Sequence, residues 1–352
     1  MKDERTEREA TLAPLAQLTF LRFVAALVVV FFHYGLVLEP IAKASTWHGL
    51  LQGAHAVSFF FVLSGFVLTV VYGSSTELTL LRPQYFYRAR IARIVPVYLL
   101  AGLCAYLVLH GSNLRDAVLF LLLLQAFVPR SALAVNPPAW SLSVEAAYYT
   151  VMPWLLLRAR RLKFAALIGL AVVLWLASMA CWAWLEHLRP PVSSRAHAFM
   201  NYFPFWHANQ FVIGMVAGFA ALRFRVSPGV AIVGMVLAAI ALTGLQILRP
   251  SALYAVGGLA PFFALLILCV YWDRSALARL LSHRWLVFLG EASYAVYLMQ
   301  VPIMELVQRQ LIASGATSVG AFTTALLALL LVSSLVYHYF ERPLRERLRP
   351  PR

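Results

Sequence analysis

The chain has 352 residues, of which 62% belong to the set AVILMFWYC and only 12% are charged. This composition, with a mean hydropathy of +0.79, is typical of a membrane protein and excludes a disordered chain, a coiled coil and a nucleic-acid-binding domain. The formal net charge of +15 fits cytoplasmic loops, where lysine and arginine are retained during insertion, and contact with anionic lipid headgroups.

The N-terminus is polar, and the first apolar run has no small-residue cleavage site after it, so no removable signal peptide is expected. Cys104, Cys181 and Cys269 occur singly within apolar stretches, which predicts buried packing residues. Neither a CxxC pair nor a metal-ligand spacing surrounds them, so we expect no metal site.

A helix needs about 20 mostly apolar residues to cross a bilayer. Ten stretches approach or exceed that length: Leu18–Leu38, Ala54–Tyr72, Ile94–Leu109, Ser141–Leu157, Phe164–Leu185, Pro204–Leu222, Val230–Leu248, Ala252–Trp272, Trp285–Leu306 and Ala321–Phe340. An eleventh, Ala117–Val128, is too short. No repeat of fixed period is evident, so we expect one all-α polytopic domain over residues 1–352, with an N-terminal tail at 1–14 and a basic tail at 344–352, both cytoplasmic.

Lysine and arginine gather in clusters that the positive-inside rule places in the cytoplasm: Lys2/Arg5/Arg8, Arg82/Arg88/Arg90/Arg93, Arg158/Arg160/Arg161/Lys163, Arg223/Arg225, Arg274/Arg279/Arg284 and the arginines of 342–352. Two expected spans separate each cluster from the next, except between Arg93 and Arg158, where three apolar segments occur. Parity therefore predicts that Ala117–Val128 is re-entrant or interfacial, and that ten helices cross the membrane. The alternative is that this segment crosses while tilted or in thinned lipid, and that one basic cluster breaks the rule.

The first expected span carries two titratable residues, Arg22 and His33. Eleven residues at 100° each return them to nearly the same helix face, about 16 Å apart along the axis. Charged groups in hydrocarbon are costly and usually face the bundle interior, where they mark a site. The alternative for Arg22 is a side chain that snorkels to the cytoplasmic headgroups. The alternative for His33 is a buried neutral imidazole with a structural role, although histidine is well suited to move a proton near neutral pH.

A second informative stretch is NPPAWSLSVE at residues 136–145, which ends with Glu145 about one turn into an expected span. Parity places the start of this span outside, so Glu145 and His33 have matching predicted depths. A carboxylate beside an imidazole would hold its tautomer and raise its basicity, as in hydroxyl activation for attack on a carbonyl. The alternative is a carboxylate that stabilises the helix N-terminus.

The basic run RPQYFYRARIARIVP occupies residues 82–96, between the second and third expected spans. Arginine binds phosphate well, and Tyr85, Phe86 and Tyr87 could stack on an adenine ring. The alternative is a positive-inside anchor on an amphipathic surface helix with interfacial aromatic residues.

Together these motifs resemble the acyltransferase-3 family of integral membrane acyltransferases. They are Arg22-x10-His33, FFFVLSGF at 59–66, the arginine segment at 86–96, WSLSVE at 140–145 and GEASYAVYL at 290–298, closing with YFERP at 339–343. Each motif alone is weak, but they occur in the family's order from about Leu15 to Leu344.

The resemblance implies transfer of an acyl group, commonly acetyl, from cytoplasmic acyl-CoA to a hydroxyl of a sugar, a cell-envelope glycan, a lipid-linked precursor or a secondary metabolite. It also implies a multi-pass protein of a bacterial inner membrane. The family's essential histidine maps to His33, and its arginines map to Arg22, Arg88, Arg90 and Arg93. Its Ser-x-x-Glu region maps to Ser141, Ser143 and Glu145, and its Ser-Tyr-x-x-Tyr-Leu segment begins at Ser293 and Tyr294.

One departure from the family concerns Gln300, where members often carry a histidine. A mechanism that needs a second histidine there does not transfer, and Gln300 is expected only to orient or hydrogen-bond a substrate. Longer members carry a C-terminal hydrolase-like domain, whereas this sequence stops at Arg352. We therefore expect the protein to complete the transfer itself or to hand the acyl group to a periplasmic or extracellular partner.

The resulting hypothesis has CoA docking on the four arginines, with the pantetheine arm bridging roughly 16 Å to His33. His33, supported by Glu145, would act as general base on the acceptor hydroxyl, while Ser64, Ser143 or Tyr149 would stabilise the oxyanion or orient the substrate. An acyl-histidine relay fits the sequence equally.

Two other classes of function remain open. A secondary transporter or flippase for an anionic solute would share the spans, the polar stripe and the arginines, but would move solute without consuming CoA. An assembly partner or sensor would have little need of titratable groups in lipid. The sequence identifies neither the acceptor nor the acyl chain length, because an acceptor pocket depends on tertiary contacts.

Overall fold

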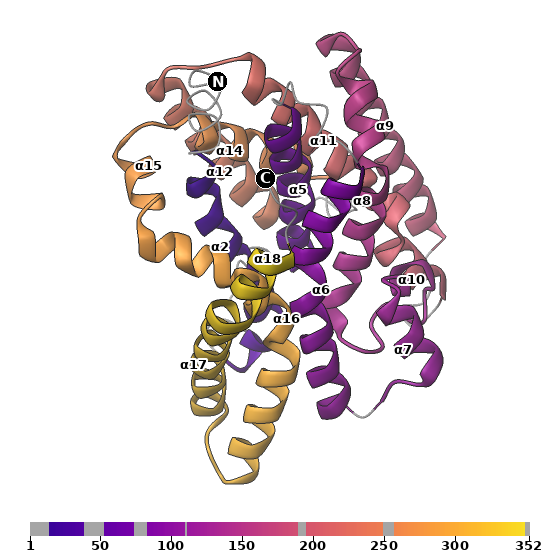
Figure 1. The fold of residues 1–352 in the computed structure, drawn as a ribbon, viewed down its shortest axis with the longest axis vertical. Coiled ribbons are helices and arrows are strands. Elements are labelled where there is room, and N and C mark those ends of the chain that lie inside the picture. The colour runs from indigo at the N-terminus through magenta and orange to yellow at the C-terminus, as the bar shows by residue number, and fades with distance from the viewer. Residues whose placement is uncertain are drawn as a thin grey trace.

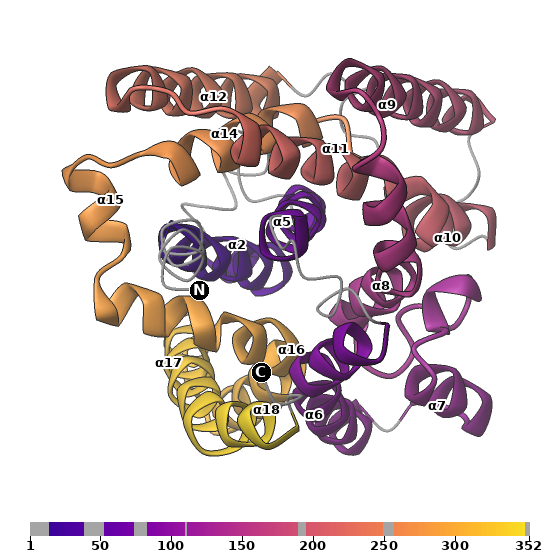
Figure 2. The same cartoon turned by 45° about the horizontal axis from the view of Figure 1, so that its top comes forward.

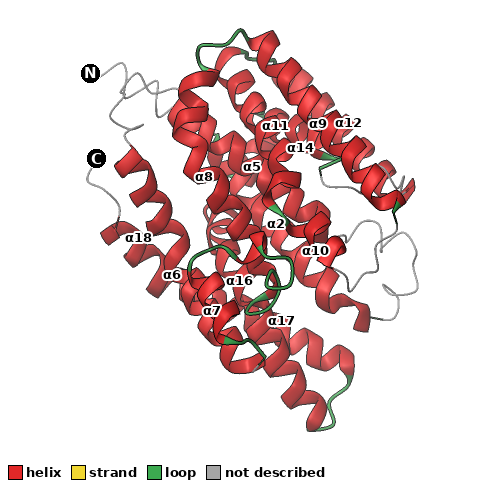
Figure 3. Ribbon diagram, turned by 90° about the vertical axis from the view of Figure 1, so that its right-hand side faces the viewer, coloured by secondary structure: helices red, strands yellow, loops and turns green. Residues whose placement is uncertain are grey.

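The structure is a computed structural model that describes residues 14–38, 53–73, 83–109, 111–188, 195–248 and 257–348. Every regular element within these ranges is a helix (Figure 3). The expected N-terminal tail lies almost wholly outside the described residues, whereas the expected C-terminal tail overlaps helix α18 (Arg342–Leu348). The chain is an all-α polytopic membrane protein, as predicted.

Each of the ten expected spans overlaps a helix, although residues 252–256 of the eighth lie outside the described residues. Eight helical segments are long and apolar enough to cross a membrane; they contain α2 (Leu15–Tyr34), α5 (Gly53–Gly73), α6 (Pro83–Leu109), α9 (Phe164–His187), α11 (Pro204–Arg223), α12 (Pro228–Leu248), α16 (Arg284–Ala313) and α17 (Ser318–Val336). The other two are α8 (Trp140–Ala159), whose first half carries polar residues, and α14 (Ala260–Trp272), which has 13 residues.

Helices α2 and α5 form the centre of the molecule. Figure 2 shows them side by side, with α16, α14, α11 and α8 among the helices around them. Helix α16 packs on α2, and α11 packs on α5. At one end of the molecule, α16 and α17 project as a helical hairpin (Figure 1). The central pair is therefore surrounded by other helices.

Glycines allow two of these helix pairs to approach at backbone distance. A Cβ atom on Gly65 of α5 would collide with the carbonyl oxygen of Phe211 on α11, and one on Gly290 of α16 would collide with that of Thr19 on α2. Small residues are the usual means of close helix approach in membranes. The glycine of the FFFVLSGF motif thus has a packing role.

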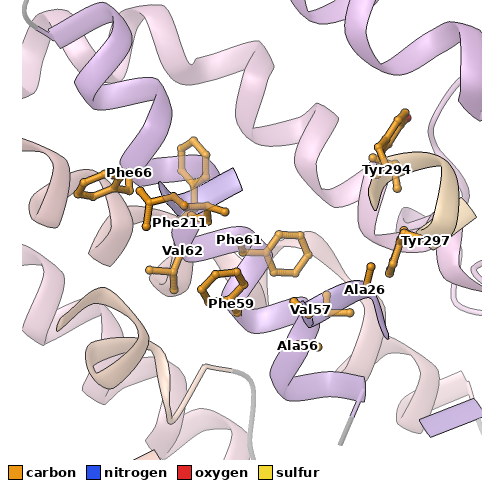
Figure 4. Packing of buried hydrophobic residues seen from close by; sticks show 14 of the residues in the cluster. Ala26, Ala56, Val57, Phe59, Phe61, Val62, Phe66, Phe211, Tyr294 and Tyr297 are labelled. Atoms are coloured by element: carbon orange, nitrogen blue, oxygen red, sulfur yellow. The ribbon is translucent and has the colours of Figure 1, made fainter. Parts of the chain in front are cut away.

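The phenylalanines of the same motif form part of the apolar core. Phe61 and Phe66 are almost fully buried, as is Phe211 of the neighbouring helix, and Figure 4 shows all three within one cluster of buried hydrophobic side chains. Phe59 contacts Phe263 of α14 with ring centroids 5.8 Å apart. Most of the motif is therefore a packing surface, and Ser64 is its polar exception.

The predicted basic clusters, as far as they lie in the described residues, meet at one end of the bundle, which we call the basic end; Lys2, Arg5, Arg8 and Arg82 lie outside the described residues. Arg160 donates to the carbonyls of Tyr72 and Gly73, joining the ends of α8 and α5. The Arg223 guanidinium lies 5.2 Å from the centre of the Phe164 ring, joining α11 to α9. This common location agrees with the charge pattern, while the assignment of the basic end to the cytoplasm stays a prediction.

The short segment before α8 folds back on itself. Helix α7 (Leu114–Leu121) has eight residues, about 12 Å, and cannot cross a hydrocarbon core of about 30 Å. The chain then bends at Leu123, which has a φ of 57°, and passes through the 3-10 turns η3 (Gln125–Phe127) and η4 (Pro137–Ala139). The prediction that Ala117–Val128 is not a crossing helix is confirmed, and its re-entrant or interfacial position stays a prediction.

Candidate active site

His33 lies in the last turn of α2 with its side chain exposed, and its Nδ1 atom is 3.1 Å from Oε1 of the buried Gln300 on α16. The Gln300 Nε2 atom donates to the carbonyl of Tyr297 at 2.7 Å, which identifies Oε1 as the atom that faces the imidazole. An amide oxygen only accepts hydrogen bonds, so Nδ1 carries a hydrogen, and in the neutral imidazole Nε2 then presents its lone pair. This is the protonation state of a general base.

A cavity of about 280 Å³ lies beside His33. Its lining includes Gly53, at the first residue of α5, so the cavity lies at the end of the central helices opposite the basic end. Trp140, Tyr202 and Tyr297 contribute aromatic walls. A small cavity with apolar walls and a few convergent polar groups is typical of a ligand site.

Ser141 and Tyr297 connect α8, η4 and α16 next to this cavity. Their hydroxyl oxygens are 2.9 Å apart, and both hydroxyls lie within hydrogen-bond distance of the Pro138 carbonyl. Asn136 donates to the Leu298 carbonyl at 3.0 Å. The NPPAWS motif is therefore anchored to α16, and it holds Tyr297 and Trp140 in the cavity wall.

The predicted pairing of Glu145 with His33 is not found among the described residues. Glu145 instead accepts a hydrogen bond from Ser64 of α5, and the Ser64 hydroxyl lies 3.4 Å from the hydroxyl of Tyr149. Tyr149 is buried, whereas Ser64 and Glu145 are half-buried. We call Ser64, Glu145 and Tyr149 the inner polar layer.

The depth of this layer follows from the hydrogen bonds of α8 and α16. His33 is bonded to Gln300, and Tyr297 lies three residues nearer the basic end on the same helix. Ser141 of α8 is bonded to Tyr297, and Glu145 lies four residues further along α8 toward the basic end. Seven residues of helix put Glu145 about 10 Å closer to the basic end than His33. The expected equal depth fails because residues 125–139 fold over the outer end of α8, so this helix begins within the bundle.

The arginine run is not a separate surface helix. Helix α6 continues from Pro83 to Leu109 with Pro96 inside it, so Arg88, Arg90 and Arg93 belong to the first turns of a span. Arg88 is exposed and donates to the Leu348 carbonyl at 2.9 Å. Arg90 is half-buried, with its guanidinium 5.9 Å from the centre of the Tyr149 ring.

Arg22 and Arg93 extend this positive region toward the interior. Both are half-buried, and they interact electrostatically with each other and with Glu341. Arg22 also interacts electrostatically with Glu145 and Tyr149. The structure thus brings the predicted arginines together at the basic end, with the inner polar layer between them and His33.

Three further candidate residues bond to backbone carbonyls. Ser143 donates to Leu123 at 2.6 Å and fixes the bend after α7, Ser293 donates to Gly290 at 2.6 Å, and Tyr294 donates to Ile94 at 2.8 Å. All three are buried, and none lines the cavity. Their contacts stabilise the fold, and their expected contact with substrate stays a prediction.

Sequence reasoning did not single out one polar network in the cavity wall. His207 donates through Nε2 to the Asn201 carbonyl at 3.0 Å and accepts from Gln210 through Nδ1 at 3.1 Å. Its ring centre lies 5.1 Å from that of Trp140. The available signal was the presence of histidine and glutamine within the apolar span Pro204–Leu222, where polar residues are costly.

Across the described residues, no group of three histidine, cysteine, aspartate or glutamate side chains is placed to hold a metal ion. The three cysteines are free. Cys269 is buried and Cys104 is half-buried, but Cys181 is exposed, so the prediction of burial is wrong for that residue. Helix α9 lies at the edge of the bundle (Figure 2), where much of its surface has no protein neighbour.

Fold and site together define a polytopic membrane protein with an imidazole at one end of its central helix and arginines at the other. The model of the acyltransferase-3 family, described as an acyltransferase domain, matches residues 15–338. The chain therefore belongs to this family and is an acyl-transferring enzyme.

Two relatives align over most of their length. The acyltransferase MdmB of Streptomyces mycarofaciens is 29% identical, with 92% of this chain and 89% of that protein covered. The exopolysaccharide production protein ExoZ of Rhizobium meliloti is also 29% identical, with 88% of this chain and 95% of that protein covered. No solved structure shows significant similarity to the chain.

Proposed function

We propose that the protein transfers an acyl group, with acetyl as the first candidate, from acyl-CoA at the basic end to a hydroxyl acceptor in the cavity. The observation that supports this proposal is the hydrogen bond of His33. Gln300 accepts the Nδ1 hydrogen, so Nε2 of the neutral imidazole is available as a base. The acceptor is a sugar, a cell-envelope glycan, a lipid-linked precursor or a secondary metabolite. ExoZ is named for exopolysaccharide production, which supports a glycan.

The donor enters at the basic end. Arg88, Arg90 and Arg93 occupy neighbouring turns of α6, and guanidinium groups bind phosphate through paired hydrogen bonds. Arg22 lies further inside, on the central helix that ends at His33, about 16 Å away along that helix. An extended pantetheine arm bridges this separation and carries the thioester toward the cavity.

The reaction requires one proton acceptor. His33 Nε2 removes the proton of the acceptor hydroxyl as its oxygen attacks the thioester carbonyl; the new C–O bond forms, the C–S bond breaks, and the proton leaves with the CoA thiol. An acyl-histidine relay uses the same nitrogen as nucleophile and the same cavity. Glu145 takes no part in either version, because it is bonded to Ser64 at a different depth.

The proposed location is a bacterial inner membrane with the basic end in the cytoplasm. The clustering of arginine at one end supports this orientation, and both relatives come from bacteria. The cavity then faces the periplasm or exterior, where a partner could present or receive the acylated product.

The test is CoA release from acetyl-CoA by the protein in liposomes supplied with an envelope glycan and lipid extract. We expect extract-dependent release that falls at least about 100-fold in His33→Ala, as loss of a general base requires. His187→Ala is the matched control, because His187 is exposed in the last turn of α9. Absence of release with several acyl-CoAs, together with solute flux, would overturn the proposal in favour of a transporter.

A further inference from the structure

The inner polar layer lies away from both the acceptor cavity and the level at which the thioester carbonyl reacts. Ser64, Glu145 and Tyr149 form one hydrogen-bonded group, about 10 Å from the level of His33. A nucleophilic Ser64 would leave the acyl group at that depth, away from the acceptor cavity. A base at Glu145 would likewise be out of reach of the acceptor hydroxyl, so none of these groups acts directly on the acceptor.

The inner polar layer lies along the proposed path of the donor. Tyr149 lies beneath the Arg90 guanidinium, and Arg22 interacts electrostatically with both Glu145 and Tyr149. Glu145 follows one helical turn closer to His33. The layer thus begins at the phosphate-binding arginines and continues toward the catalytic imidazole.

A pantetheine arm contains two amide groups and a hydroxyl within a chain that extends roughly 15 Å at ordinary bond lengths. Inside an apolar helix bundle, each amide is costly to bury without a hydrogen-bond partner. A carboxylate offers about four acceptor positions, so the bond from Ser64 leaves Glu145 able to accept an amide N–H. The Tyr149 hydroxyl, which is also hydrogen-bonded to Glu145, can rotate its hydrogen toward an amide carbonyl when an arm N–H takes its place on the carboxylate.

We propose that the inner polar layer is the binding site for the pantetheine arm of the donor. Glu145 accepts an arm N–H, Tyr149 donates to an arm carbonyl, and Ser64 fixes the Glu145 carboxylate between them. This assignment rests on the proposed function, because acyl-CoA is the donor there. It makes Glu145 a donor-binding residue with no part in activating His33.

The test compares three acetyl donors in the liposome assay: acetyl-CoA, S-acetylpantetheine and S-ethyl thioacetate, which has no amide. We expect Glu145→Gln and Tyr149→Phe each to lower kcat/KM for acetyl-CoA and S-acetylpantetheine about tenfold, mainly through KM. The kcat/KM for S-ethyl thioacetate should stay unchanged. Tyr148→Phe is the matched control, because the hydroxyl of this adjacent buried tyrosine bonds to the Pro204 carbonyl instead. It should not change the ratio between donors.

A second measurement covers the case in which S-ethyl thioacetate reacts too slowly. Pantetheine and adenosine 3′,5′-bisphosphate are used as inhibitors against acetyl-CoA. Glu145→Gln should weaken inhibition by pantetheine about tenfold and leave inhibition by the bisphosphate unchanged, whereas Arg90→Gln should do the reverse. Equal loss for all donors, or for both inhibitors, would overturn the inference. An inactive wild-type protein would instead refute the proposed function.

Discussion

At the scale of single residues, Gln300 determines the chemical state of His33. The sequence predicted a residue that orients substrate, whereas the structure bonds its Oε1 to the imidazole and its Nε2 to a backbone carbonyl. The oxygen and the nitrogen of the amide are both hydrogen-bonded, so the orientation of the amide is defined. Gln300 thus becomes a hydrogen-bonding partner for the proposed base.

We predict that Gln300→Met lowers kcat about tenfold and leaves the KM for acetyl-CoA unchanged. Methionine keeps the length of the side chain but cannot accept the Nδ1 hydrogen, and loss of one such hydrogen bond corresponds to about 1.4 kcal/mol, or tenfold in rate. Steady-state kinetics on the liposome-embedded protein measures this effect. Gln310→Met, at an exposed position on the same helix, should have no effect, and an unchanged kcat in Gln300→Met would contradict the prediction.

At the scale of helices, the position of α8 explains why the site differs from its prediction. The turn after α7 is held by Ser143, which donates to Leu123, and by Gln125, which donates to Ala139 at 3.0 Å. These bonds fold residues 125–139 over the outer end of α8. Depth estimated from the start of an apolar run assumes that the run begins at the membrane surface, and this helix does not.

Close packing of α5 on α11 gives a second prediction. Gly65→Ala should destabilise the protein by about 1–3 kcal/mol, because the added methyl group meets the Phe211 carbonyl and the two helices must move apart. Thermal unfolding in detergent measures the change. Gly169→Ala is the matched control: this helical glycine has no atom within 4 Å of an added Cβ, and alanine there should be neutral or slightly stabilising. Equal stability of the two variants would refute close packing as the cause.

At the scale of the whole molecule, the two ends have opposite chemistry. Arginines from α6, α8 and α11 gather at the basic end, whereas the cavity at the other end is lined by aliphatic, aromatic and uncharged polar side chains together with histidines. The central helix α2 connects them, with Arg22 near its beginning and His33 near its end. This polarity suits a donor and an acceptor that approach from opposite sides of a membrane.

The orientation can be tested with single cysteines in a variant that lacks the three native ones. Ser314→Cys, between α16 and α17, should react with a membrane-impermeant maleimide in intact spheroplasts. Ser282→Cys, at the basic end before α16, should react only after permeabilisation. Both serines are exposed in the structure, so accessibility within the fold is matched, and the reverse pattern would show that the basic end lies outside.

The sequence by itself determined the class of fold, the helical segments, the common end of the basic clusters and the family. These depend on local properties: the length of an apolar run, the charge beside it and the order of short motifs. Only the tertiary structure decided that His33 is bonded to Gln300, that Glu145 is bonded to Ser64, and that His207 lines the cavity. Such contacts join residues far apart in the chain, and they depend on the relative depth and rotation of packed helices, which apolar composition does not specify.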